Sequence, residues 1–455
     1  MDIQYTIKQL FARIEVLTEE LSRLRKENTA LVNKVSDLEN KLFKKNSKNS
    51  SIPPSKDENR VKPNQSLRKK SGKKSGGQKG HKGDTLKMLD TADQIVDHKY
   101  KYCINCQEAL VTEQEQIGKR QVVDIPPIKP MVTEHRIYKC LCKCGHVNQS
   151  SYPKEASSPI SYGNNVVSSI GYLSVGQYMS MGRIVELFDQ MYNIKLSQGT
   201  ICNLLEKLTT KCMPIYDQIK KRILSSRVVG SDETGCVVNG KKWWMWTWQN
   251  ELLTYIAASE SRGYKAITDN FKDGLPNAVL VSDSWASQLK TPAKLHQLCL
   301  AHIQREMKYF IEGFNNRWCR KFLKLIYEAL SLKKSILLNP HTDFENQIKE
   351  IKAKGSVLLN QTVKGNKKMQ ALKKRLSKYE KSLWVFLEYK EVPPDNNGAE
   401  RAIRNVKIKQ KVSGQFRSQK GAQQFAVIRS VYDTIRKNNG QAFNTLALVA
   451  KSVPE

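Results

Sequence analysis

The chain has 455 residues, with 76 Lys and Arg against 43 Asp and Glu, which gives a formal net charge of +33. This charge predicts an anionic partner, nucleic acid before membrane, and no apolar run approaches the roughly 18 residues of a membrane span. The polar start is not typical of a signal peptide, and the ten cysteines favour thiols or metal ligands over disulfides, so we expect a cytoplasmic, nucleoid-associated protein with no membrane partner.

Residues 1–45 carry a leucine at every seventh position from Leu10 to Leu38. A second set of positions, also spaced seven residues apart and on the same side of the helix, is apolar as well, except at Asn28. The two sets together form the seam of the helix. About six such heptads predict a left-handed coiled coil, and one Asn in the seam favours a parallel dimer in fixed register. An amphipathic helix packed on its own chain is the alternative, although it would need a wider apolar stripe. We therefore expect a homodimer, or a higher oligomer, formed through this leucine zipper.

Residues 46–95 are predicted to be a basic linker. Its stretch SLRKKSGKKSGGQKGHKG has no apolar content that could offset the entropy of ordering, so we expect it to be disordered alone. A solvated linker and a basic arm lying along phosphates both fit this composition, and the sequence leaves both open.

Five cysteines lie in a predicted zinc-binding module, residues 96–155: Cys103, Cys106, Cys140, Cys142 and Cys144. Two cysteine pairs about 35 residues apart suit a tetrahedral site that folds a small module with little core. The first pair has the regular C-x2-C spacing. For the second pair we predict Cys140 with Cys144, and Cys142 with Cys144 is the alternative. Four thiolates leave no position for water, so we expect structural Zn²⁺; buried or redox-active thiols are the other interpretation.

Residues 156–222 show helical periodicity, interrupted at YNIKLSQGT. Ile184 and Phe188 lie on one apolar face before the break, and Ile201 and Leu205 lie on another after it. Ser197 is the expected N-cap of the second helix. Helix, short turn and helix fit a helix-turn-helix that reads DNA, and they fit plain three-helix packing equally well. The basic composition favours the first interpretation.

From residue 223 the pattern of apolar residues changes from that of helices to that of strands. VVGSDETGC, KKWWMWTWQN, LLTYIAAS and NAVLVSDSWAS read as four strands, and two of them run into Asp232 and Asp283. Acidic residues at strand ends sit where a sheet presents groups to a ligand. A third acid, Glu400, lies in a predicted helix after a Pro-Pro pair. Taken singly, each acid has a plainer explanation, as a turn residue, a cap or a surface ion pair.

Three carboxylates on two strands and a helix provide the oxygen ligands that Mg²⁺ or Mn²⁺ prefers. Two such ions, about 3.5–4 Å apart, can activate an attacking oxygen and stabilise a leaving one in phosphoryl transfer. The basic residues that follow the third acid would neutralise phosphates there, and the candidates are Arg401, Arg404, Lys407, Lys409 and Lys411.

Several blocks of the chain, over nearly its whole length, resemble the insertion sequence 66 family of bacterial DDE transposases. KNSKNSSIPPSKD with GGQKGHKGDTLKML resembles the family's linker, and the cysteine cluster resembles its zinc module. SDETG, LCLAHIQREMKYF and DNNGAERAIRNVKIKQKVSGQFRSQKGAQ resemble its catalytic blocks. The resemblance implies a multidomain α+β protein, with a ribonuclease-H-like catalytic domain over residues 223–430, a helical insertion at about 305–390 and a C-terminal tail at 431–455.

By this match Asp232, Asp283 and Glu400 are the catalytic acids, while the roles of Cys299 and His302 in the C-x-A-H block stay open. The implied function is DNA transposition, a form of DNA recombination: binding of the insertion sequence's terminal repeats, strand cleavage and joining to target DNA. The element's small accessory proteins are possible partners. Two alternatives remain, a non-catalytic DNA-binding regulator derived from a transposase and a metal-dependent nuclease without joining activity.

Overall fold

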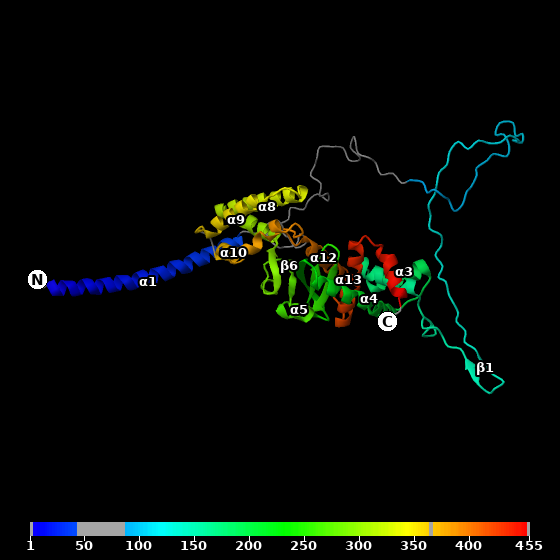
Figure 1. Cartoon of the computed structure of the whole chain (residues 1–455), viewed down its shortest axis with the longest axis horizontal. Coiled ribbons are helices and arrows are strands. Elements are labelled where there is room, and N and C mark those ends of the chain that lie inside the picture. The colour runs from blue at the N-terminus through cyan, green and yellow to red at the C-terminus, as the bar shows by residue number, and fades with distance from the viewer. Residues whose placement is uncertain (1–2, 43–86, 364–366, 453–455) are drawn as a thin grey trace.

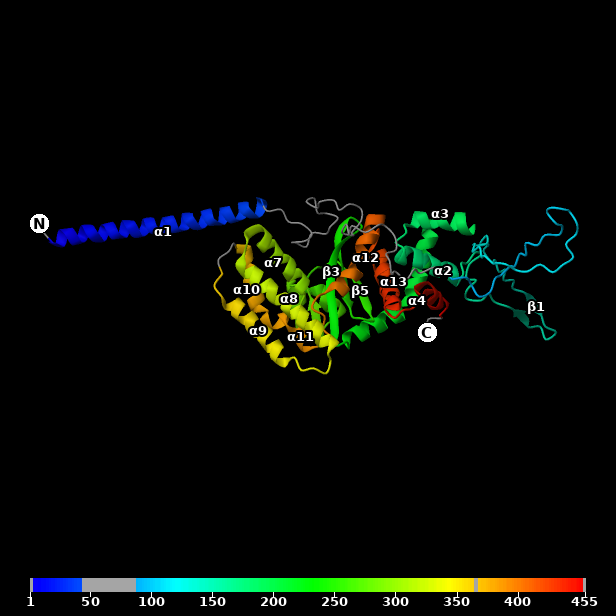
Figure 2. The ribbon, with the colours of Figure 1, turned by 90° about the horizontal axis from the view of Figure 1, so that it is seen from above.

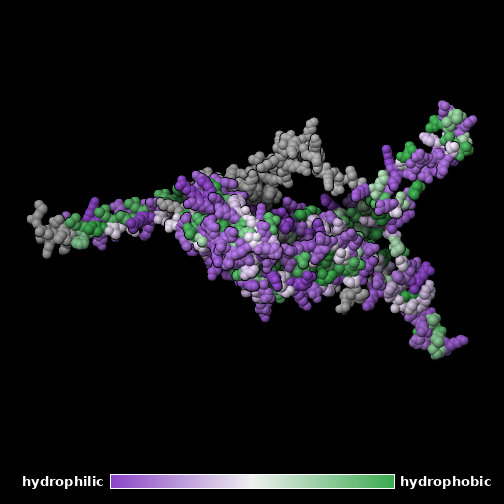
Figure 3. Space-filling view, turned by 45° about the horizontal axis from the view of Figure 1, so that its top comes forward, coloured by the Kyte–Doolittle hydropathy of each residue, from purple (hydrophilic) through white to green (hydrophobic). Residues whose placement is uncertain are grey.

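The computed structural model describes residues 3–42, 87–363 and 367–452. Most of the predicted basic linker, residues 46–86, lies outside the described residues. Helix α1 (Ile3–Leu42) is one continuous helix that projects from the rest of the chain (Figure 1). Its seam leucines stay solvent-exposed in the single chain; Leu24, for example, keeps 54% of its surface accessible. Figure 3 shows these apolar side chains alternating with polar ones along the projecting helix.

Residues 87–163 contain little regular structure, apart from the antiparallel hairpin of β1 (Lys139–Leu141) and β2 (Val147–Gln149). This segment extends away from the body of the molecule (Figure 1), and most of its side chains are exposed. It has too little buried apolar surface to hold a fold by packing alone.

The helical segment that follows comprises α2 (Asn164–Gly171), a π-helical turn, η2 (Tyr172–Gly176), α3 (Met181–Tyr192) and α4 (Gln198–Leu224). Ser197 is the N-cap of α4, as predicted: its hydroxyl accepts a hydrogen bond from the Thr200 N–H at 3.0 Å. The buried side chains of these helices belong to the same apolar core as the sheet below. The core is therefore continuous across the predicted boundary between residues 222 and 223.

A five-stranded mixed sheet forms the centre of the molecule, with strands β3 (Val228–Val238), β4 (Lys241–Gln249), β5 (Thr254–Ser259), β6 (Leu275–Ser282) and β7 (Ala293–Leu298). The spatial order is β5-β4-β3-β6-β7. The first three strands form an antiparallel meander, and β6 and β7 run parallel to β3. Strands β3 to β6 match the four predicted strands, whereas β7 was not predicted.

Both edges of this sheet are covered by helices from distant parts of the chain. At β5, the Ile256 N–H donates to the Ser430 hydroxyl of α13 (Gln419–Lys437) at 2.8 Å, and the Tyr216 hydroxyl of α4 donates to the Ile256 carbonyl at 2.8 Å. Covered edges cannot pair with another chain. Helix α14 (Ala442–Lys451) packs on α2, so the stretch predicted as a C-terminal tail is part of the core.

A helical lobe lies between β7 and α12 (Asn397–Ser413) in the sequence. It is built from α7 (Leu300–Phe314), α8 (Arg317–Leu338), α9 (Glu345–Asn360), α10 (Lys367–Lys378), η3 (Glu380–Leu383) and α11 (Val385–Glu388). The lobe has its own apolar core and lies to one side of the sheet (Figure 2). It covers the β7 edge, where the Phe386 N–H donates to Gln297 Oε1 at 2.9 Å. Mixed strands and helices in two cores confirm the α+β class. No helix in the described part of the chain is both long and apolar enough to cross a bilayer.

Candidate active site

Strand β3 directs Asp232 towards α12. Successive side chains of a strand point to opposite faces, so Gly230 and Asp232 share one face. A Cβ atom on Gly230 would lie 2.8 Å from Asn396 Oδ1, just before α12, which shows that this face of β3 meets the start of that helix. Asp232 therefore lies on the face of the sheet that α12 covers.

Asp283 follows directly after β6, the parallel neighbour of β3. The register pairs Gly230 with Val281, so two residues further along each strand Asp232 and Asp283 come side by side. Asp283 Oδ1 accepts a hydrogen bond from the Trp285 N–H at 3.1 Å, which fixes the carboxylate at the start of the next turn. The prediction of a strand-end acid agrees with the structure for Asp283 but is wrong for Asp232, because β3 continues to Val238; the parallel register still brings the two acids to neighbouring strands.

Glu400 lies in the first turn of α12, and the loop before it is tied to both neighbours. Asn396 Nδ2 donates to the Ser231 carbonyl at 2.6 Å, next to Asp232. The Asn396 N–H donates to Cys299 Sγ at 3.2 Å, and the Leu300 N–H donates to the Pro394 carbonyl at 2.9 Å. These bonds hold the start of α12 between β3 and the start of α7.

The three predicted acids act on one another electrostatically. Burial, then the charges of Glu233, Asp283 and Glu400, raise the pKa of Asp232 well above its ordinary value. A group of carboxylates that raises the pKa of its own member favours a bound cation, because a cation removes the repulsion. Glu400 Oε1 is buried and has no hydrogen-bond partner among the described residues, so one oxygen of the group is open to a ligand. Oxygen donors of this kind fit Mg²⁺ or Mn²⁺.

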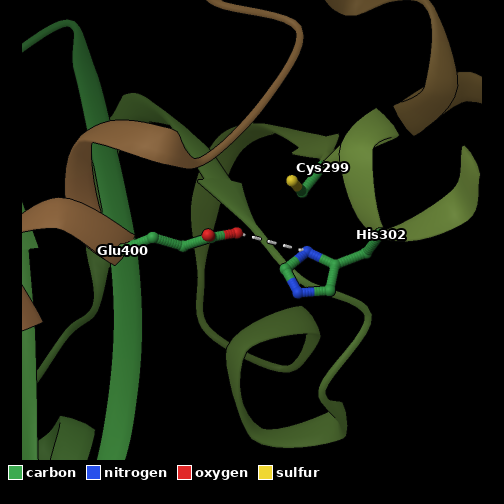
Figure 4. Close-up of side chains that lie close together, drawn as sticks. All are labelled: Cys299, His302 and Glu400. Atoms are coloured by element: carbon green, nitrogen blue, oxygen red, sulfur yellow. Dashed lines mark ion pairs between the residues drawn. The ribbon is translucent and has the colours of Figure 1, made fainter. Parts of the chain in front are cut away.

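One imidazole and two guanidinium groups surround Glu400. Nδ1 of His302 lies 3.8 Å from Oε1, and guanidinium nitrogens of Arg305 and Arg404 lie 3.9 and 3.8 Å from Oε2. The sequence singled out His302 only through the C-x-A-H block, and it gave no signal for Arg305. Figure 4 shows His302 and Cys299, both from the start of α7, pointing towards Glu400.

Glu233, next to Asp232 on the chain, points to the opposite face of β3. Its side chain is 2% exposed and bonds to Arg262 Nε at 3.0 Å and Gln288 Nε2 at 2.7 Å. Burial, and then the charge of Asp283, raise the pKa of Glu233 to about 7. The Arg262 guanidinium carbon also lies over the rings of Trp244 and Trp285, 4.7 and 3.9 Å from their centroids. Sequence analysis missed this pair, in which the carboxylate is buried and the guanidinium is 41% exposed, because its partners come from separate elements.

The basic residues of α12 differ in their surroundings. Arg401 lines a cleft, and the Arg404 side chain is 69% exposed. Lys407 Nζ donates to the Gly235 carbonyl at 2.7 Å, and Lys411 is exposed. Lys409 donates to the carbonyls of Ser174 and Met179, and burial lowers its pKa to about 8. Its ammonium group therefore joins α12 to η2 and the turn after it.

A cleft of about 1900 Å³ opens between the helical lobe and the sheet with α12 and α13. Its lining contains more basic than acidic residues, and the basic ones include Arg227, Lys334, Lys390, Arg401 and Arg436. The cleft reaches residues 396–398 at the start of α12, one turn before Glu400, so an anionic chain bound in it would pass close to the acids.

The cysteines of residues 96–155 fall into two separate turns. The Gln107 N–H donates to the Cys103 carbonyl, and the Gly145 N–H donates to the Cys142 carbonyl. Within the described residues, the predicted zinc ligands do not converge on one point. Hydrogen bonds from Cys144 lower the pKa of the Cys142 thiol, which places this pair in one turn. Cys140 is in strand β1, and the choice of Cys140 or Cys142 as the partner of Cys144 stays a prediction.

Comparison with known families supplies the class of protein. Residues 159–424 match the family model described as "Transposase IS66 family". Because the match covers more than half of the chain, the chain belongs to the IS66 family of transposases, which confirms the resemblance noted in its sequence. Residues 3–87 match a family of unknown function, DUF6444. No curated protein matches the chain.

Proposed function

We propose that this transposase binds the ends of its insertion sequence and catalyses metal-dependent cleavage and strand transfer at Asp232, Asp283 and Glu400. The observation that supports it best is the mutual arrangement of the three acids. The parallel register of β3 and β6 places Asp232 and Asp283 on neighbouring strands, and α12 carries the third acid. Among the described residues, oxygens of the three acids do not all lie within 4.8 Å of one another, so a bound metal would draw them together. The mixed sheet with helices around it is compatible with the ribonuclease-H-like fold that the family resemblance implies.

The three carboxylates would hold Mg²⁺ or Mn²⁺, which when bound supplies Lewis-acid stabilisation of the phosphoryl oxygens. The chain's own residues set the conditions for that chemistry. Asp232 and Asp283 are fixed at the sheet, and the loop bonds of Asn396 fix the helix that carries Glu400. Such fixed positions hold the reacting groups in place before the reaction begins. Arg305 and Arg404 place positive charge where the phosphates would lie.

The DNA path that we propose runs along α12 and the adjoining cleft. Arg401, Arg404, Lys407 and Lys411 are the phosphate contacts, and the cleft offers further cations from α8 and α13. We leave Lys409 out, because its ammonium group is partly buried and bonded to two backbone carbonyls, whereas Lys407, with one such bond, stays exposed. Contacts to phosphate position DNA without reading its sequence, and their affinity falls as salt rises.

We assign recognition of the DNA sequence to the segments that precede the sheet in the chain. Helices α3 and α4 with the turn between them are the helix-turn-helix candidate, in which α4 would present its polar first turn to DNA. Zn²⁺ bound by Cys103 and Cys106 with Cys144, and with Cys142 or Cys140, would unite the two cysteine turns into one module. The exposed leucine seam of α1 would pair two subunits, as bringing together two element ends requires.

Acid-to-amide substitutions test this proposal. Labelled element-end DNA would be incubated with Mg²⁺ and the wild type, Asp232→Asn, Asp283→Asn or Glu400→Gln, with Glu345→Gln as control because this acid is exposed on α9. We expect nicking and joining by the wild type and control, and no cleavage, with DNA binding retained, by the three site variants. Cleavage without joining would favour the nuclease. Binding alone, even with the element's accessory proteins, would favour the regulator.

A further inference from the structure

Cys299, His302 and Glu400 form a compact group at the junction of α7 and α12. One ligand atom from each residue lies within 4.8 Å of the others. Cys299 is buried, with 1% of its surface exposed, and the side chains of His302 and Glu400 are 23% and 14% exposed. Figure 4 shows the thiol, the imidazole and the carboxylate pointing into the same space.

The backbone places these groups firmly. Cys299 is the N-cap of α7, and His302 lies three residues later, where side chains of a helix are neighbours. The Cys299 N–H donates to the Ser282 carbonyl at 2.8 Å, and Cys299 Sγ accepts from the Asn396 N–H at 3.2 Å. The backbone of Cys299 is therefore anchored to β6, and its thiol to the loop before Glu400.

Two of the three groups have an unsatisfied polar atom. His302 Nδ1 and Glu400 Oε1 face each other at 3.8 Å, and in the described part of the chain neither has a hydrogen-bond partner although both atoms are buried. Buried polar atoms are nearly always satisfied by protein, water or an ion. Both atoms point to a ligand between them that accepts lone pairs.

We propose that Cys299, His302 and Glu400 form a zinc site separate from the predicted cysteine module, and that Zn²⁺ bound there inhibits the transposase. Sulfur, nitrogen and oxygen donors together suit Zn²⁺, whereas Mg²⁺ takes oxygen ligands. Tetrahedral zinc with ordinary bond lengths needs donor atoms about 3.3–3.6 Å apart. The observed limit of 4.8 Å therefore requires the donors to close by roughly 1 Å, with water as the fourth ligand.

Neighbouring charges limit the affinity of this site for zinc. Arg305 and Arg404 lie 3.9 and 3.8 Å from Glu400 Oε2, the oxygen that faces away from His302. Their charges oppose a second cation, so zinc binds reversibly. Burial raises the pKa of the Cys299 thiol to about 11, and the hydrogen bond from Asn396 to Sγ opposes this rise, so zinc must displace the thiol proton when it binds.

Inhibition follows from the shared carboxylate, and this part of the inference rests on the proposed function. If Glu400 is a ligand of the catalytic Mg²⁺, a zinc ion that draws its Oε1 towards Cys299 and His302 removes it from Asp232 and Asp283. Zinc and magnesium then compete for one side chain, and excess Mg²⁺ relieves the inhibition.

Binding is tested first, without activity, with Co²⁺ as a probe for zinc. Wild-type protein, Cys299→Ser and His302→Gln would be titrated with Co²⁺, and the sulfur-to-cobalt charge-transfer absorbance would be recorded. Cys202→Ser is the control, because that exposed thiol lies outside the group. Cys103→Ser/Cys106→Ser in each background removes the signal of the cysteine module. In these backgrounds we expect a sulfur-to-cobalt band in the wild type and in the Cys202→Ser control. We expect Cys299→Ser and His302→Gln to lose this band. Equal bands in all four proteins would overturn the site.

Inhibition is tested next with Zn²⁺ titrated into the Mg²⁺-dependent cleavage reaction, each variant being normalised to its own rate without zinc. We expect the half-inhibitory zinc concentration to rise at least about tenfold in Cys299→Ser and in His302→Gln. Unchanged half-inhibitory concentrations in both variants would refute the inhibitory role. If the wild type binds Co²⁺ at this site but cleaves no DNA, the proposed function fails, the site stands and the inhibitory role is rejected with the activity.

Discussion

Removing one partner of the Arg429–Asp433 pair should destabilise the central sheet together with the helices that pack on it. Arg429 donates to both oxygens of Asp433, at 3.0 and 2.6 Å, and to the Val175 carbonyl of η2 at 3.0 Å. The two side chains are only 3% and 12% exposed. Asp433→Ala would leave a buried guanidinium without its counter-charge, which costs about 3–5 kcal/mol. At about 2–4 °C per kcal/mol, the melting temperature should fall by roughly 6–20 °C.

An exposed pair of the same spacing is the matched control for this experiment. Lys265 and Asp269 are also four residues apart on a helix and lie 2.8 Å apart, but their side chains are 75% and 52% exposed. Asp269→Ala should therefore cost less than about 0.5 kcal/mol. The double variant Arg429→Met/Asp433→Leu should recover most of the loss, since no buried charge is left unpaired. Chemical denaturation curves measure all three, and equal costs for Asp433→Ala and Asp269→Ala would refute the reasoning.

Three further predictions concern the other parts of the chain. Ser197→Ala removes the hydrogen bond to the Thr200 N–H and should lower stability by about 1 kcal/mol, visible as a melting shift of about 2–4 °C; an unchanged melting temperature would contradict the cap. Mg²⁺ at about 100 times its dissociation constant should stabilise the wild type by about 2.7 kcal/mol and Asp232→Asn much less, and equal thermal shifts would argue against a metal at this carboxylate. Leu24→Ser in the full chain should weaken self-association in sedimentation experiments, whereas Lys26→Ser, outside the seam, should not; equal masses for the two variants would exclude the zipper.

The sequence predicted those parts of the site that depend on local pattern. Apolar runs that end in an acid located Asp232 and Asp283, because a buried strand reads as a continuous apolar stretch. The Ser197 cap followed from the residue type that helix starts prefer. Strand β7 was missed because AKLHQL alternates weakly and carries a histidine and a glutamine; Gln297 is nevertheless buried and bonded to the helical lobe.

The contacts that the sequence did not predict join residues far apart along the chain. Arg305 meets Glu400 only because the loop before α12 is bonded to the start of α7. Lys409 looked like one more cation in a basic helix, yet tertiary packing buries it against carbonyls of η2 and the turn after it. Periodicity reports which face of a helix is apolar, and it carries no information on which distant segment covers that face.

The central claim is that one site performs both cleavage and joining, and pre-cleaved DNA tests it most directly. Element ends that already carry a free 3′-hydroxyl would be supplied with target DNA and Mg²⁺ to the wild type and to Glu400→Gln. We expect the wild type to join these ends to the target, with no covalent protein–DNA product, and Glu400→Gln to bind the DNA without joining it. Joining by Glu400→Gln at the wild-type rate would contradict the assignment of Glu400 to a shared active site.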